Sequence, residues 1–435
     1  MAKDAKVSMK VLVDKEKNRV VFAEADYNFV DILFSFMTLP MGAIVRLLGK
    51  QEKKFEALGS LNNLHKSLVD LPVGYFFTEE CKVMLLNPKS SSYDHCRKLR
   101  LNIDDTEPTK YFICGEWRCN RLWLPKLSLC NTARCTYCGK SMDQEIRFKY
   151  TSSSADDVCV SSGVFVSDAT TFIVSDDLCV MPYTLEGCIQ LLKDVGISYT
   201  RHLDERTVDI SREQVLDLLG FALSCNYPLT FLLLDGSHPI QELVHPVQGS
   251  FNQSTLINNK ASTSPNFSLH VSLQKSTGKL LFAEAEEDLV DFVFGFLAIS
   301  LGTVIGTLTN GASSLICMDN IFRSVLNLSK GRYLKSQEDI EGTSSTTFNN
   351  PSVNRELFKR SGMFIVMDDF VITPSSYVST MDKLNKLKVP LFDIKKHKIS
   401  IGVEEGIKLL KASLRSSSVL TTGLEDQLKK LNPNV

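Results

Sequence analysis

Hydrophobic and polar residues alternate near the start of the chain and then change to helical spacing. Residues 7–13 alternate in this way, and the Asn18-Arg19 pair turns the chain into a second apolar run. A period of two is typical of a half-buried strand, so the pattern predicts a hairpin. After Asp26, which we expect to open a helix, the apolar residues recur on one helical face, at positions 29, 30, 33, 34 and 37.

Two apolar stretches, residues 29–48 and 289–309, are each about long enough to span a bilayer. The first is interrupted by Asp31, Pro40 and Arg46, and charges inside a bilayer are costly. We therefore expect buried core helices and no membrane insertion. Proline lacks the N–H that a first helical turn leaves unpaired, so a second helix is expected to start at Pro40.

The later part of the first half has the same kind of pattern. Short apolar runs at 172–174 and 179–181 flank Asp176-Asp177, which predicts a second hairpin. Two helices are expected after it, near 184–195 and 211–224. Ser211 and Gln214 have the spacing of a capping box at the start of the second helix.

This succession occurs twice along the chain. Residues 7–48 align without a gap to 267–308, and the Phe-Ala-Glu-Ala run at 22–25 recurs at 282–285. Further matches follow in the same order, and their offset falls from 257 to 192, so the first copy carries 65 extra residues between 76 and 172. The sequence therefore predicts a tandem duplication of a hairpin-plus-helices domain, with an α+β fold.

The offsets divide the chain into three parts and place an insertion within the first. Residues 236–266 are rich in Ser, Asn, Gln and Pro and lack periodicity, which is typical of a linker. The expected boundaries are 1–235 for copy one, about 82–165 for the insertion within it, 236–266 for the linker and 267–435 for copy two.

Composition narrows the class of protein. The chain has 49 Lys+Arg against 50 Asp+Glu, with 43% hydrophobic residues, which excludes a wholly disordered chain and a generally polybasic nucleic-acid coat. The N-terminal residues lack the apolar core of a secretory signal. We therefore expect an intracellular protein, cytoplasmic or nuclear, whose twelve cysteines favour metal ligation or burial over disulfides.

Five of the cysteines lie between positions 114 and 138. Cys135 and Cys138 have the two-residue spacing of a zinc knuckle, while Cys114 and Cys119 form a looser pair with four residues between them. Four thiolates close the coordination sphere, so we expect a structural zinc ion in a small zinc-ribbon-like insertion. The alternative ligands that the sequence leaves open are Cys130, Cys96 and Cys81.

The same segment is locally basic and aromatic. Residues 110–149 include eight basic and three acidic side chains, and both tryptophans of the chain. Basic residues interleaved with aromatic ones can bind single-stranded nucleic acid through phosphate contacts and stacking. The alternative is that both tryptophans pack over the metal site. If nucleic acid is bound, the expected contacts are Arg118, Arg121, Trp123 and Lys126.

The candidates for catalysis are weak. The Asp pairs at 176–177 and 368–369 each follow a Phe-Ile-Val strand, where Asp is favoured in a hairpin turn. Asp31 and Asp291 are expected in the first turns of their helices, where negative charge suits the helix dipole. Walker-type, HExxH and GxSxG motifs are missing from the sequence. We therefore expect no enzyme and infer no small-molecule substrate, although a site between the copies is a third possibility.

The repeated blocks and the Cys-Gly-Lys-Ser-Met run at 138–142 together resemble a plant family catalogued as domain of unknown function 674. The resemblance covers both copies and the insertion, and it implies no activity, substrate or catalytic residue. The sequence thus predicts a non-enzymatic intracellular binding or scaffold protein with an unidentified protein partner. Single-stranded nucleic-acid binding is the alternative function.

Overall fold

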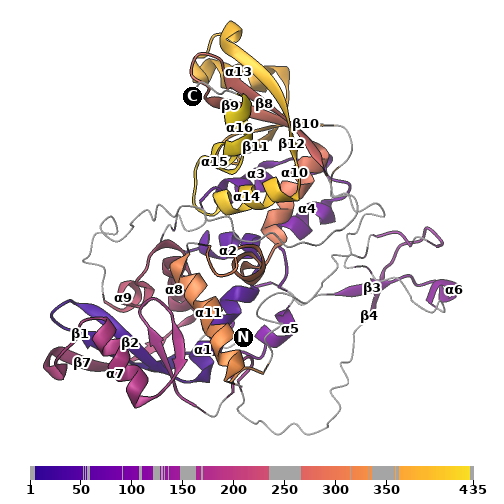
Figure 1. Ribbon diagram of the computed structural model, residues 1–435. Helices are drawn as coiled ribbons and strands as arrows, with labels where there is room; N and C mark the ends of the chain where they lie inside the picture. Colours follow the sequence, from indigo (N-terminus) through magenta and orange to yellow (C-terminus); the bar gives the residue numbers. More distant parts are fainter. Residues whose placement is uncertain are drawn as a thin grey trace.

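The computed structural model has an α+β fold, as the sequence predicts, built around two five-stranded antiparallel sheets (Figure 1). The sheets lie at opposite ends of the body, and most helices lie between them. The structure describes residues 5–51, 53, 55, 59–90, 92–106, 110–120, 128, 131, 133–135, 137–146, 163–167, 170–234, 266–313, 315–331, 333–335, 358 and 362–431.

The first sheet has the strand order β6-β5-β2-β1-β7. Both hairpins predicted in this half are present, and Asn18 takes a positive φ of 46° in the first turn. The edge strand β7 was not predicted because most of its side chains are polar and partly exposed. The strands are β1 (Val7–Asp14), β2 (Arg19–Ala25), β5 (Phe172–Ser175), β6 (Val180–Pro182) and β7 (Leu203–Ile210).

The second sheet has the equivalent order β11-β10-β9-β8-β12. Gly278 forms the β8–β9 turn with a φ of +72°, a conformation that glycine adopts without steric cost. The equal strand order is observed, whereas descent from one duplicated domain stays a prediction. The strands are β8 (Phe267–Gln274), β9 (Leu280–Glu286), β10 (Met363–Val366), β11 (Ile372–Pro374) and β12 (Ile394–Ile401).

The four helices predicted in the first half begin where the sequence indicates, and the structure adds further helices that were not predicted. The Asp26 carboxylate accepts the N–H groups of Asn28 and Phe29 and so caps α1. Ser211 and Gln214 form the predicted capping box of α8, and Pro40 is the N-cap of α2. These helices are α1 (Tyr27–Thr38), α2 (Met41–Leu48), α3 (Leu61–Asp70), α4 (Glu79–Leu86), α5 (Tyr93–Cys96), α7 (Leu185–Asp194), α8 (Arg212–Ser224) and α9 (Pro228–Leu233).

In the second half the counterpart of α1 and α2 is less regular. A 3₁₀ turn (Gly295–Ala298) and a π-helical turn (Thr303–Leu308) follow α10. Among the described residues, none of the helices combines the length and the apolar run that crossing a membrane requires. The α-helices are α10 (Glu287–Phe294), α11 (Ile316–Lys330), α13 (Tyr377–Leu387), α14 (Val403–Ser413), α15 (Val419–Gly423) and α16 (Glu425–Leu431).

The two halves exchange equivalent helices. Helix α3 of the first half packs against β11 and α10 of the second, while α11 of the second packs against β6, α1 and α8 of the first. The Ser67 hydroxyl accepts the N–H of Ile372, and at the equivalent place the Ser324 hydroxyl accepts the N–H of Val180. Each sheet is therefore completed by a helix from the other half.

The halves also meet at one self-equivalent point. The N–H of Met41 donates to the carbonyl of Ile299, and the N–H of Leu301 donates to the carbonyl of Leu39, both at 2.9 Å. Residues 39 and 41 are the sequence equivalents of 299 and 301, so the contact is reciprocal. Reciprocal contacts of one patch with its own equivalent are the signature of a two-fold interface.

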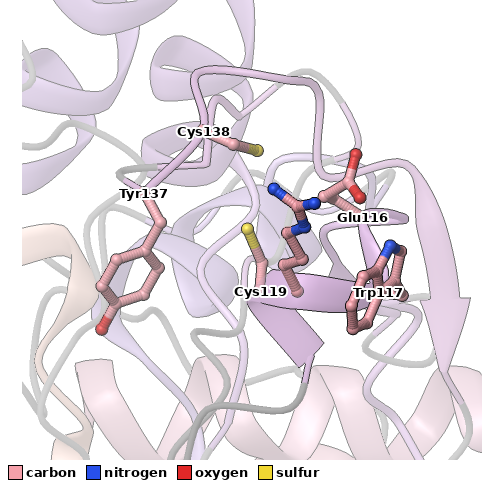
Figure 2. Close-up of a pocket in the computed structure, with 6 residues that line it drawn as sticks. Glu116, Trp117, Cys119, Tyr137 and Cys138 are labelled. Atoms are coloured by element: carbon pink, nitrogen blue, oxygen red, sulfur yellow. The ribbon is translucent and has the colours of Figure 1, made fainter.

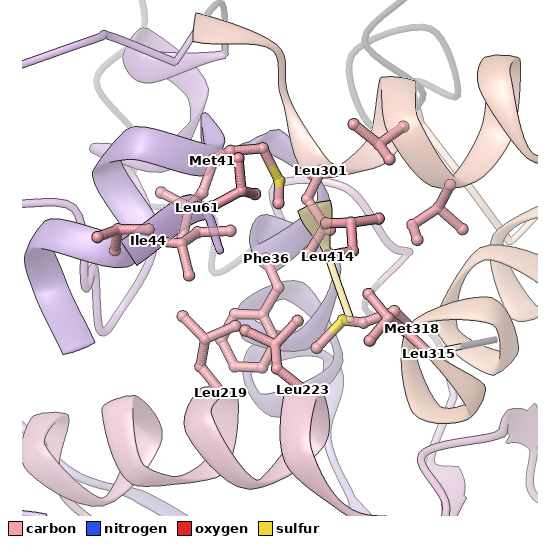
Figure 3. Close-up of a cluster of buried hydrophobic side chains, with 14 of the residues drawn as sticks. Phe36, Met41, Ile44, Leu61, Leu219, Leu223, Leu301, Leu315, Met318 and Leu414 are labelled. Carbon is pink, nitrogen blue, oxygen red and sulfur yellow. The ribbon is translucent and has the colours of Figure 1, made fainter. Parts of the chain in front are cut away.

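One hydrophobic core extends through both halves. Figure 3 shows Phe36 and Met41 from the first half beside Leu301 and Met318 from the second (Figure 3). A smaller cluster lies on the outer face of the second sheet, where Leu384 of α13 packs on Phe282 and Ile365. Because the main core is shared, we expect the halves to depend on each other for stability.

Candidate metal centre

The cysteine-rich segment forms a small module that projects from the body (Figure 1). Strand β3 (Tyr111–Ile113) pairs with β4 (Gln144–Ile146), and the short helix α6 (Trp117–Asn120) follows β3. Earlier residues of the predicted insertion, such as Leu85, Cys96 and Ile103, belong to the main core instead. The separate module thus comprises the described residues between 110 and 146.

The first pair of cysteines is positioned by the end of β3 and by α6. Cys114 follows the strand directly and is buried, and its Sγ accepts the backbone N–H of Glu116. The N–H of Cys119 donates to the Glu116 carbonyl at 3.0 Å, which turns the second thiol back toward the first. This local turn explains how two cysteines with four residues between them face one another.

The second pair lies in a tight turn. The N–H of Gly139 donates to the carbonyl of Cys135 at 2.7 Å, and the N–H of Cys135 donates to the carbonyl of Lys140 at 2.8 Å. Gly139 has a φ of +74°, so a glycine is favoured there. The N–H groups of Tyr137 and Cys138 point at the Cys135 sulfur, which is the arrangement expected of a metal-binding knuckle.

The four sulfur atoms converge on one point. The Sγ atoms of Cys114, Cys119, Cys135 and Cys138 all lie within 4.8 Å of one another. The Cys114 and Cys138 sulfurs are 3.4 Å apart. A tetrahedral ion with metal–sulfur bonds of about 2.3 Å requires sulfur–sulfur separations of about 3.8 Å. The four cysteines could therefore hold a metal ion after only small shifts.

The pKa values of Cys119 and Cys135 are shifted in opposite directions. Burial raises the pKa of Cys119 to about 12, and the neighbouring thiols add to the effect. Burial also acts to raise the pKa of Cys135, but the N–H groups of Cys138 and Tyr137 outweigh it and bring this pKa to about 7. A bound cation would favour the ionised form of a thiol such as Cys119, whose pKa is raised.

An ion pair ties the two cysteine loops together. Lys140 Nζ lies 2.7 Å from Glu116 Oε2, and the hydrogen bond with this carboxylate raises the pKa of Lys140. The small core of the module consists of the buried cysteines and Met142, with Ala133 packed against them. Trp117 is 58% exposed, so the interpretation that it packs over the site is wrong. The buried Met142 packs with Cys114, Cys119 and Cys135 instead.

An open pocket of about 550 Å³ lies beside the sulfurs. Figure 2 shows Cys119 and Cys138 directed into the same space, with Trp117 on one side and Tyr137 on the other (Figure 2). Tyr137 is 56% exposed. The Arg118 guanidinium carbon lies 5.4 Å from the centre of the Trp117 ring. One side of the metal centre therefore presents aromatic and charged groups to solvent.

A family model described as "Protein of unknown function (DUF674)" matches residues 3–354 and, in a second match, 340–404. The chain belongs to the DUF674 family. Neither a search of curated proteins nor one of solved structures gives a match. The predicted resemblance is thus confirmed, and membership of DUF674 brings no activity or ligand with it.

The alternative ligands in this DUF674 chain lie elsewhere or outside the described residues. Cys81 and Cys96 are buried in the main core, where Cys96 lies 3.5 Å from the Thr38 hydroxyl. Both alternatives are therefore wrong, because packing in the body holds these cysteines away from the cluster. Of the predicted nucleic-acid contacts, Arg118 lies at the pocket. The residues outside the described part are Arg121, Trp123, Lys126 and Cys130.

The paired aspartates of the DUF674 chain have structural partners. Asp176 lies in the predicted β5–β6 turn, and its carboxylate accepts both the N–H and the hydroxyl of Thr230. Asp368 binds Thr421 in the same two ways. Each aspartate thus joins its turn to the start of a helix, α9 or α15. Sequence reasoning missed these bonds, although Thr230 and Thr421 match in the repeat.

Asp31 has a role that the sequence did not reveal. It is the fifth residue of α1 and not part of the first turn, so the helix-dipole interpretation is wrong. Asp291 is likewise the fifth residue of α10. The buried Asp31 carboxylate accepts three successive N–H groups, from Val164, Phe165 and Val166. It thereby anchors the segment through which the chain returns to the first sheet.

Proposed function

We propose that this DUF674 protein is a non-enzymatic intracellular binding or scaffold protein, cytoplasmic or nuclear, with a structural zinc ion. The observation that carries the proposal is the convergence of four thiols within 4.8 Å of one another. Four protein ligands leave no position for a water or substrate at a tetrahedral ion, so the metal would hold the module in shape. We therefore propose that the metal has a structural and not a catalytic role.

The donor set favours zinc. Four sulfur ligands in tetrahedral array select Zn²⁺ or an iron–sulfur centre. The Cys135–Cys138 turn matches a mononuclear knuckle, since its N–H groups point at one sulfur and Gly139 closes the turn. The module also lacks a large hydrophobic core of its own, and a structural zinc ion can supply the missing stability.

The exposed side of the centre supports a binding role. Trp117 and Tyr137 are both more than half exposed, and they flank the pocket that contains Arg118. Tryptophan, tyrosine and arginine are the residues that most often dominate the affinity of protein interfaces. The module projects from a body whose halves share one core, so it would present these side chains from a rigid base. We therefore propose a protein partner.

Metal analysis combined with partner capture tests the proposal. The purified, reduced protein should contain about one zinc per chain, without the visible absorption of an iron–sulfur centre. Partners should be captured by the full chain and lost with Trp117→Ala plus Tyr137→Ala. The matched control is Tyr199→Ala, which removes an exposed tyrosine from the first sheet unit. Purified protein without zinc would contradict the structural metal. Equal partner lists for wild type and for Trp117→Ala with Tyr137→Ala would contradict the binding surface.

Single-stranded nucleic-acid binding is a second candidate function. The supporting observation is the proximity of the exposed Arg118 and Trp117 side chains in one open pocket. This candidate predicts salt-dependent binding of short oligonucleotides that Arg118→Ala with Trp117→Ala weakens. Binding that is absent at low salt would exclude it. Residues 114–119 are common to both candidates, so zinc content must be checked in each variant.

A further inference from the structure

Two exposed loops lie side by side at one end of the second five-stranded sheet. We call this surface the basic tip and define it as residues 275–279 and 388–395. It contains the β8–β9 turn and the 3₁₀ helix η6 (Leu391–Asp393), which joins α13 to β12. The N–H of Lys275 donates to the carbonyl of Asp393 at 2.7 Å, and the N–H of Ser276 donates to its carboxylate at 2.9 Å. The two loops therefore form one surface.

Two large apolar side chains project from the basic tip. Phe392 is 81% exposed and Leu391 is 65% exposed. Their backbone is held in place, because Lys275 Nζ donates to the Phe392 carbonyl at 2.6 Å. Single exposed apolar residues are common on protein surfaces, but two adjacent ones on a fixed turn form a protruding apolar point.

Lysines surround this apolar point. Residues 383–398 contain six lysines and a single acidic residue, Asp393. The equivalent residues of the first half, 192–207, contain three basic and three acidic side chains. Lys275, Lys279, Lys388 and Lys395 are all exposed. The basic tip, with four lysines and Asp393, is thus positively charged. The equivalent residues of the first half, 15–19 and 197–204, contain four basic and two acidic side chains.

The equivalent tip of the first half shows what the basic tip lacks. Thr200 and Arg201 occupy the positions of Leu391 and Phe392, and the neighbouring Tyr199 is exposed, at 71%. Some of the charges around it are paired, because Lys15 Nζ lies 3.1 Å from the Asp204 carboxylate. The first-half tip therefore has part of its charge paired, and it has Thr200 and Arg201 in place of the adjacent apolar side chains Leu391 and Phe392.

We propose that the basic tip binds peripherally to anionic lipid membranes. Phe392 and Leu391 would enter the headgroup region, and the surrounding lysines would contact lipid phosphate and carboxylate groups. Basic residues around exposed aromatic and aliphatic side chains suit such an interface, where each lysine near an anionic leaflet strengthens binding by about fivefold. A nucleic acid would use the lysines and leave the aliphatic Leu391 without a role.

Vesicle sedimentation of the full chain tests the proposal. Phosphatidylcholine vesicles with about one third phosphatidylserine should bind the protein, and pure phosphatidylcholine vesicles should bind it at least about tenfold more weakly. Leu391→Ser with Phe392→Ser should weaken binding by about tenfold or more, because the apolar insertion is lost. Lys279→Glu with Lys395→Glu should weaken it by a similar factor and remove the dependence on phosphatidylserine.

Two matched controls make the result specific. Tyr199→Ser removes the exposed tyrosine at the equivalent tip of the first half, and Lys66→Glu with Lys193→Glu makes the same change in net charge on the first half. Both should leave vesicle binding unchanged, and all variants should keep the wild-type unfolding midpoint because every altered side chain is exposed. The proposal is overturned if wild-type protein ignores phosphatidylserine. It is also overturned if Leu391→Ser with Phe392→Ser has no effect on vesicle binding. The same holds if oligonucleotides compete with vesicles for the protein and the variant with both serines still binds oligonucleotides as wild type does.

Discussion

The side-chain amide of Asn63 donates a 3.0 Å hydrogen bond to the backbone carbonyl of Asp369, which lies in the other half of the protein. The equivalent pair is Asn320 and Asp177, again at 3.0 Å and with donor and acceptor halves reversed. Each bond connects an exchanged helix, α3 or α11, to the turn between two strands of the sheet that it covers. Removing either helix would leave a sheet face of the opposite half uncovered.

Substitution of these asparagines should weaken the whole protein. Asn63→Ala removes a donor to a partly buried carbonyl, so we expect the free energy of unfolding to fall by about 1 kcal/mol. Asn320→Ala should cost about 2 kcal/mol, because Asn320 also donates to the Asp177 carboxylate and accepts from Arg323. Urea unfolding followed by circular dichroism measures both values. Lys66→Ala on the exposed face of α3 is the control, with an expected change below about 0.5 kcal/mol.

Cleavage between the halves tests the exchange directly. A protease site placed within residues 236–265 should give two fragments that still elute together and unfold in one transition, because the main core belongs to both. Size-exclusion chromatography and calorimetry of the cleaved protein are the measurements. Two separate elution peaks, or two resolved transitions, would show that the halves are independent.

Metal removal should affect the projecting module and spare the body. Cys135→Ser removes one of four ligands, and we expect zinc content to fall to a small fraction of one per chain. The body should keep its unfolding midpoint, since the cysteine cluster and the main core are separate. Cys188→Ser, at a buried cysteine on α7, should retain the metal. Elemental analysis of each variant decides the matter, and equal zinc in both would contradict the ligand assignment.

Gly59 should not tolerate a larger residue. Its φ is +48°, and an added Cβ would lie 2.7 Å from the Ser413 carbonyl oxygen and 2.9 Å from the Arg415 nitrogen. Both atoms belong to the backbone of the other half, so neither can move aside easily. We expect Gly59→Ala to lower the free energy of unfolding by about 2 kcal/mol or more.

Gly74 is the matched position for that experiment. An added Cβ there would have no heavy atom within 4 Å, and its φ is not positive. Gly74→Ala should be neutral or stabilise the protein by about 0.5 kcal/mol, because alanine restricts the unfolded chain. Thermal unfolding of the two variants side by side provides the comparison. Equal effects would mean that the contact between Gly59 and the second half is loose.

The stability contributed by Asp31 should depend on pH. Burial raises the pKa of Asp31 from 3.8 to about 6, although the N–H groups of Val164, Phe165 and Val166 partly offset the effect. Between these two values the folded chain binds more protons at this site than the unfolded chain does. The contribution is therefore fully present below pH 3.8 and is lost as the pH rises through 6, by about 3 kcal/mol in total.

The difference in the free energy of unfolding between wild type and Asp31→Asn isolates the contribution of the Asp31 carboxyl group. Asparagine does not titrate, so the wild-type protein should lose stability relative to the variant as the pH rises from about 4 to 7. Urea midpoints at several pH values measure the difference. A difference that stays constant, or one that changes in favour of wild type, would contradict a raised pKa.

Local patterns predicted the local structure of this fold. The hairpins, the capping box at Ser211 and the gathering of Cys135 and Cys138 all depend on residues close together in the chain. The exchange of α3 and α11 could not be predicted, because periodicity shows which face of a helix is buried and not what covers it. Asn63 and Asn320 are the same residue type, so this residue does not indicate which sheet each helix covers. The anchoring of Val164–Val166 by Asp31 likewise joins residues more than 130 positions apart.

The contact between residues 39–41 and 299–301 limits which substitutions each half can accept. A change on one side of that junction alters the surface that the other side must fit, so substitutions there are constrained in pairs. The cysteine-rich module of the first half and the basic tip of the second half both lie away from this junction, so substitutions in them are not constrained in this way. The contact between the halves therefore constrains the residues at the centre of the molecule and not those at its two ends.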